Sequence, residues 1–130
     1  MFIEKYVHYQ YCLSMNTEID RKIAVILVAD VVGYSKHMEK DENSTITNYS
    51  DCEKILNKLL KKYKGSVFNT GGDSVLVEFP SAVNAVECGV AFQNEIKKRN
   101  ASDKTDMKLA FRIGINMGDV VNKDGNLIGD

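Results

Sequence analysis

The sequence predicts a single α+β domain in which an antiparallel sheet carries helices on one face. Three observations lead to this fold. Residues 23–29 form a continuous apolar run typical of a buried strand, and two later segments show the three- and four-residue spacing of amphipathic helices. Two short β-type runs also surround a pair of adjacent glycines, as in a hairpin. In chain order the elements read β-α-β-β-α-β, the split βαβ arrangement of a ferredoxin-like sandwich.

Composition limits the function classes. With 130 residues, 44% of them hydrophobic, the chain suits one domain with a real core. A formal net charge of -1 gives no sign of a nucleic-acid surface or an anionic-membrane anchor. The three cysteines are widely spaced, which argues against a disulfide framework or a zinc site and favours a cytoplasmic location. No apolar run approaches the roughly 20 residues of a transmembrane helix, and the N-terminus lacks a signal-peptide pattern.

The first twenty residues differ from the rest and are interpreted as an N-terminal extension, with the domain spanning residues 21–130. Four of the aromatic residues fall in it, namely Phe2, Tyr6, Tyr9 and Tyr11. We expect a short helix or strand that packs on the domain. Met15 leaves open that the first fourteen residues are an upstream addition.

The first half of the domain begins with the strand at residues 23–29, which ends at Asp30 and is followed by a turn containing Gly33. Residues 42–63 then predict a helix that stops at Gly65. Its apolar positions are Ile46, Tyr49, Cys52, Leu56, Leu59 and Tyr63.

The second half begins with the hairpin, whose strands at 66–70 and 73–79 are joined by a turn at Gly71-Gly72. Pro80 ends the second strand, and a helix follows to about Arg99. The predicted core-facing residues of this helix are Val83, Val86, Val90 and Ile96. Residues 108–116 alternate as a half-buried strand does, with a core side formed by Leu109, Phe111, Ile113 and Ile115.

Topology predicts that two aspartates meet. In a split βαβ sheet the third strand lies between the first and the second and is antiparallel to both, so Asp30 and Asp73 should lie side by side. Adjacent carboxylates repel unless they share a cation, and Mg²⁺ binds one or two carboxylates together with substrate phosphates. The pair therefore predicts metal-assisted phosphoryl or nucleotidyl transfer with two metals.

The turn after Asp30 supplies a candidate phosphate site. Backbone N–H groups around Gly33, Tyr34 and Ser35 can cradle phosphate oxygens, and Gly33 lets the backbone approach a ligand closely. Arg112, on the last strand, is interpreted as a solvated residue or an ion-pair partner.

Three segments together resemble the catalytic domain of class III adenylate/guanylate cyclases, of the bacterial adenylate cyclase type. They are residues 30–35 (DVVGYS), 68–80 (FNTGGDSVLVEFP) and 112–120 (RIGINMGDV). The match runs from about Arg21 to Asp130. The resemblance implies conversion of ATP to cyclic AMP and pyrophosphate in cyclic-nucleotide signalling, by a head-to-tail homodimer with both sites at its interface.

The resemblance also implies roles for residues. Asp30 and Asp73 would bind two Mg²⁺ or Mn²⁺ ions, assisted by the Val31 carbonyl. The nucleotide contacts would come from Val32, Gly33, Tyr34, Ser35, Asn69, Gly72 and Asn126. Asn69 stands where many members have a purine-reading Lys, and Asn126 takes the partner purine position.

The chain departs from the family's pattern at its C-terminal end, and this departure keeps a second function open. The family's transition-state Asn and Arg would follow Asp130, so the sequence predicts a C-terminally truncated domain with little or no turnover. The alternative is a non-catalytic, cyclase-like module that binds nucleotide or mediates dimerisation. A diguanylate cyclase, which also uses a Gly-Gly-acid hairpin, is disfavoured because Ser74-Val75 follow Asp73 where that family has Glu-Phe.

Overall fold

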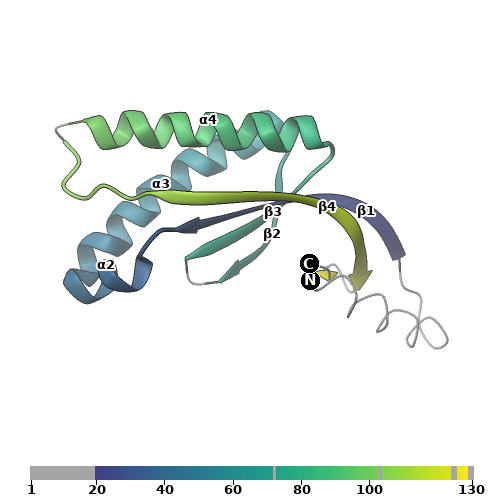
Figure 1. The fold of residues 1–130 in the computed structure, drawn as a ribbon, viewed down its shortest axis with the longest axis horizontal. Helices are drawn as coiled ribbons and strands as arrows, with labels where there is room; N and C mark the ends of the chain where they lie inside the picture. The colour runs from purple at the N-terminus through teal and green to yellow at the C-terminus, as the bar shows by residue number, and fades with distance from the viewer. Residues whose placement is uncertain (1–19, 72, 103, 124–125, 129–130) are drawn as a thin grey trace.

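The computed structural model describes residues 20–71, 73–102, 104–123 and 126–128, which form a two-layer sandwich of one sheet and three helices (Figure 1). The five strands are ordered β2-β3-β1-β4-β5, and every neighbouring pair is antiparallel. The strands are β1 (Asp20–Val31), β2 (Ser66–Gly71), β3 (Ser74–Phe79), β4 (Phe111–Lys123) and β5 (Asn126–Ile128). The helices are α2 (Tyr34–Lys40), α3 (Glu42–Tyr63) and α4 (Ala82–Ala101). The predicted α+β sandwich is confirmed, while the predicted extension falls almost wholly outside the described residues.

Strand β1 lies inside the sheet, between β3 and β4. Its odd-numbered residues Val25 to Val31 face the helices and join the main core, while Ala24 and Ile26 are buried on the opposite face beside Phe68. The predicted strand is therefore confirmed and is longer than expected. Asp30 lies within it, one residue before its end.

Helix α3 has the predicted bounds and largely the predicted buried side, since Cys52 and Leu56 are in the core and Tyr49, Leu59 and Tyr63 pack against it. Ile46 is 50% exposed, and the residues that the helix buries are Thr45, Asn48, Cys52, Leu56 and Leu60. Its last turn ends at Lys64, which adopts the left-handed conformation (φ 63°) that a glycine usually supplies. Gly65 follows for a steric reason, because a Cβ there would lie 2.7 Å from the Leu60 side chain.

The β2–β3 hairpin is present, with Gly71 paired to Ser74. Its two-residue loop is therefore at positions 72 and 73, one residue later than the predicted Gly71-Gly72 turn. This shift accompanies an irregularity in register between Val67 and Asn69. Gly72 itself lies outside the described residues.

Helix α4 begins as predicted, since the Ser81 hydroxyl accepts a hydrogen bond from the Asn84 N–H at 3.1 Å. Its predicted core face was wrong for the three valines, however. Val83, Val86 and Val90 are 63%, 51% and 56% exposed. The helix buries Ala85, Cys88, Gly89 and Phe92, together with the predicted Ile96.

Small residues explain this orientation, because they let α4 approach the sheet closely. A Cβ added at Gly89 would lie 3.6 Å from both Leu27 and Ile113, so even an alanine would be in direct contact with the strands. Val86 and Val90 border a groove of about 340 Å³ between α4 and β4, which Ile113 and Ile115 also line.

The last part of the chain differs most from expectation. Strand β4 begins at Phe111 and continues to Lys123, well beyond the predicted end at residue 116. Helix α2 and strand β5 were not predicted. No described helix has the length and apolar character to cross a membrane.

Candidate metal and nucleotide site

The end of β1 brings Asp30 next to the β2–β3 turn. Asp30 pairs with Ser74 across the sheet, and the Val31 N–H donates to the Asp73 carbonyl at 3.3 Å. The two aspartates predicted to meet thus occupy neighbouring backbone positions, one on a central strand and one in a tight turn. Both side chains are partly exposed, so solvent and ions can reach them.

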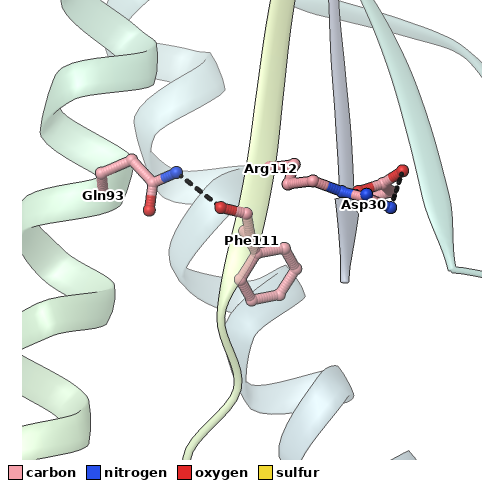
Figure 2. A network of polar contacts seen from close by, with 4 residues as sticks. All are labelled: Asp30, Gln93, Phe111 and Arg112. Atoms are coloured by element: carbon pink, nitrogen blue, oxygen red, sulfur yellow. Dashed lines mark hydrogen bonds and ion pairs between the residues drawn. The ribbon is translucent and has the colours of Figure 1, made fainter. Parts of the chain in front are cut away.

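A guanidinium group accompanies the Asp30 carboxylate. Arg112 lies directly opposite Asp30 on β4, and its Nε and Nη2 donate to Oδ1 and Oδ2 at 3.0 and 3.3 Å (Figure 2). The hydrogen bond to Asp30, the charge of Asp30 and the charge of Asp73 together raise the pKa of Arg112. The sequence left Arg112 as a solvated residue or an ion-pair partner, and the structure shows the ion pair. Knowledge of the β1–β4 register would have revealed it.

The start of β4 is held from the helix side of the sheet. Gln93 of α4 donates from Nε2 to the Phe111 carbonyl at 2.9 Å, immediately before Arg112 (Figure 2). The Phe111 ring packs edge-on against Phe92, with ring centroids 5.0 Å apart, and its ring is tilted against that of Tyr49 at 6.4 Å. These contacts fix the backbone from which Arg112 reaches Asp30.

The same aromatic cluster holds the predicted phosphate loop. Tyr34, the first residue of α2, packs edge-on against Tyr49 at 6.2 Å, so its ring belongs to the core. Burial, followed by the negative charges of Glu53 and Asp73, raises the pKa of Tyr49 to about 12. Tyr49 therefore stays neutral and acts as a packing residue.

Only some of the backbone N–H groups in the loop are available to bind an anion. Gly33 is left-handed (φ 67°) and begins α2 without a side-chain cap. The first hydrogen bond of the helix runs from His37 N–H to the Gly33 carbonyl at 3.1 Å, so the amides of Tyr34 and Ser35 precede it. Val32 differs, since its N–H already donates to the Ala110 carbonyl at 2.8 Å. Of the four predicted loop residues, Val32 therefore has no amide to offer a ligand.

The predicted purine residues are on separate strands. Asn69 belongs to β2 and Asn126 to β5, which form the two edges of the sheet, with three strands between them. Their side chains, like all of Gly72, lie outside the described part of the structure.

The donor set fits a hard divalent cation. The predicted ligands are two carboxylates and the Val31 carbonyl, all oxygen donors of the kind that Mg²⁺ and Mn²⁺ prefer. The Asp30 carboxylate already pairs with the Arg112 guanidinium group, so a cation can reach it from the face of the sheet that the helices do not cover. Among the described residues no cluster of three or more His, Cys, Asp or Glu side chains forms a different metal site.

Known proteins resemble this chain in both sequence and fold, although no protein-family model matches it. "Putative adenylate cyclase 3" of Rhizobium meliloti (strain 1021) is 45% identical over 113 residues, which are 86% of this chain. The adenylate/guanylate cyclase/hydrolase from Silicibacter pomeroyi is 30% identical, with a TM-score of 0.77 over 87% of this chain. The chain is a homologue of class III nucleotide cyclase catalytic domains. A bacterial light-regulated adenylyl cyclase shares the fold at 22% identity, with a TM-score of 0.78.

The cyclase homologue is shorter than the proteins it matches. It spans 19% of the R. meliloti protein and 66% and 65% of the two solved chains. Nucleotide cyclase activity of this chain is therefore a proposal. The solved structures include both adenylyl and guanylyl cyclases, so the base specificity belongs to the proposal below.

Proposed function

We propose that this cyclase domain converts ATP to cyclic AMP and pyrophosphate at a site built on Asp30 and Asp73. The observation that carries the proposal is the pairing of β1 with the β2–β3 turn, which places the two acids in neighbouring positions beside an exposed glycine turn. The name of the 45% identical relative supports adenylate over guanylate chemistry.

Each residue has a defined task in this proposal. The carboxylates of Asp30 and Asp73, with the Val31 carbonyl, would hold two Mg²⁺ or Mn²⁺ ions. When bound, such ions activate the ribose 3′-hydroxyl and hold the triphosphate. The amides of Gly33, Tyr34 and Ser35 would orient phosphate oxygens at the start of α2.

The remaining parts of the proposal concern the base and the assembly. Asn69, Gly72 and Asn126 would contact the nucleotide, and an Asn side chain can both donate to and accept from an adenine edge. We propose that the domain works as a homodimer in cytoplasmic cyclic-nucleotide signalling, and sedimentation velocity tests the dimer directly.

Calorimetric titration of the chain with Mn²⁺ and a non-cyclisable ATP analogue tests the site, and an assay for cyclic AMP follows. Asp30→Asn and Asp73→Asn should each abolish Mn²⁺-dependent binding of the analogue, because each removes a charged metal ligand. Asp51→Asn is the matched control, since Asp51 is an exposed aspartate of α3. If neither site variant weakens binding, the proposed site is wrong. A parallel titration with the GTP analogue measures base preference.

A second candidate is a non-catalytic module that binds nucleotide or mediates dimerisation. Two observations favour it: Asn occupies both predicted purine positions, and Arg112 engages both oxygens of Asp30. Because little or no turnover is expected of residues 1–130, the deciding result is a positive one: cyclic AMP that forms from ATP and is lost in Asp30→Asn would exclude this candidate.

A further inference from the structure

We infer that Arg112 is a built-in counter-cation of the metal site, which pairs with Asp30 in the metal-free protein and is displaced when a divalent cation binds. The inference rests on the proposed function, because it takes Asp30 as a metal ligand. It adds a residue that sets the metal affinity without being a ligand itself.

The geometry sets Arg112 and a metal ion in competition for one carboxylate. Arg112 donates to both carboxylate oxygens of Asp30, at 3.0 and 3.3 Å, in the bidentate fork typical of arginine and carboxylate. A Mg²⁺ ion would need one of those oxygens at about 2.0–2.1 Å. An ion in that place would also be repelled by a guanidinium group still held against the same carboxylate. Metal binding at Asp30 therefore favours release of the Arg112 guanidinium group.

The arginine is the partner that can move. Its side chain is 70% exposed, whereas that of Asp30 is 29% exposed and is carried by a central strand. Asp30 is the one hydrogen-bonding partner that Arg112 has among the described residues. Once released, the guanidinium group swings into solvent while Asp30 keeps its place beside Asp73.

The pairing has a consequence for the metal-free state. Two neighbouring carboxylates would repel each other if both were charged and unpaired. Arg112 neutralises one of them, and the charge of Asp73 also acts on Arg112. Arg112 thus offsets the repulsion in the metal-free protein, and a metal ion at Asp30 must compete with a cation that is already attached.

Titration of the 130-residue chain with Mn²⁺, followed by electron paramagnetic resonance of the free ion, measures this competition without any activity assay. Arg112→Gln should bind Mn²⁺ about three- to tenfold more tightly, the range expected from removing one exposed ion pair and one nearby positive charge. Arg112→Lys, which keeps the charge but loses the fork, should fall between that variant and the native chain.

Lys22→Gln is the matched control. It removes one positive charge from the other cross-strand ion pair of β1, Lys22 with Glu78 at 2.9 Å, about 26 Å along the strand from Asp30. Its Mn²⁺ affinity should equal that of the native chain. An equal gain in both variants would show that net charge alone acts, and would overturn the inference.

The outcomes separate the inference from the proposed function. Native binding that depends on Asp30, with no gain or a loss in Arg112→Gln, overturns the inference and leaves the metal site standing. Absence of Asp30-dependent binding in every variant overturns both. A second measurement needs no substitution: the Arg112 Nε–H resonance of the native chain should lose its hydrogen-bonded shift on addition of Mg²⁺. An unchanged resonance at saturating Mg²⁺ also overturns the inference.

Discussion

Replacing Phe92 with alanine should strongly destabilise the chain, whereas the same change at Val90, two positions earlier on α4, should not. Phe92 is 1% exposed, and its ring packs edge-on against Phe111 at 5.0 Å. Truncating a buried Phe costs about 3–5 kcal/mol, a large share of the roughly 5–15 kcal/mol that stabilises a typical domain. Val90 is 56% exposed, so Val90→Ala should change the free energy of unfolding by less than about 0.5 kcal/mol.

Urea unfolding followed by far-UV circular dichroism measures both variants. With a denaturant slope of about 1–3 kcal/mol per M, Phe92→Ala should lower the unfolding midpoint by more than about 1 M. Phe92→Leu, with an expected loss of about 1–2 kcal/mol, provides the measurement if the alanine variant is unfolded in water. Equal losses at the two positions would mean that α4 buries its valine side, contrary to the structure.

Two further predictions concern the packing and the acid sensitivity of the fold. Gly65→Ala should lower the free energy of unfolding by about 1–3 kcal/mol, because its Cβ would lie 2.7 Å from the Leu60 side chain. Gly114→Ala is the control, since a Cβ there has no atom within 4 Å, and it should leave the urea midpoint unchanged. The pKa of Asp106 lies below its ordinary value of 3.8, first because the Asn48 side chain donates a hydrogen bond to it. The contribution of Asp106 to the stability of the fold is therefore present above pH 3.8 and is lost as the pH falls through the pKa of the folded state. Asp106→Asn should therefore lose less stability on acidification than the native chain, and equal pH slopes of the urea midpoint would contradict this.

The parts of the fold that follow from local pattern were predictable from the sequence. Alternation, helical spacing and the Gly-Gly pair located four strands and the two long helices. Right-handed, unknotted connections between elements in the order βαββαβ then predicted that β3 lies beside β1. The proximity of Asp30 and Asp73 required no long-range information beyond that order, which is why it could be predicted.

The errors arose where pattern leaves more than one solution. Helix α4 has two stripes with helical spacing, one of bulky valines and one that is mostly small residues together with Phe92 and Ile96. Hydrophobicity favours the valines, but close packing on the sheet selects the stripe containing Gly89, and periodicity alone cannot distinguish them. Strand β5 is three residues long and α2 seven, too short for a periodic signal. The Arg112–Asp30 pair depends on a register that only the assembled sheet defines.

The fold constrains the three charged groups of the site to different degrees. This difference decides which group can change the metal affinity without changing the fold. Asp30 is on a strand paired on both sides, so its backbone position is fixed by the whole sheet. Asp73 is in a two-residue turn, tied to β1 by the hydrogen bond from Val31. Arg112 has a fixed backbone and an exposed side chain that is held by its ion pair with Asp30. A change of metal affinity that leaves the fold intact is therefore most easily made at Arg112, where only a side chain must move. The same change at Asp30 would remove the ligand itself.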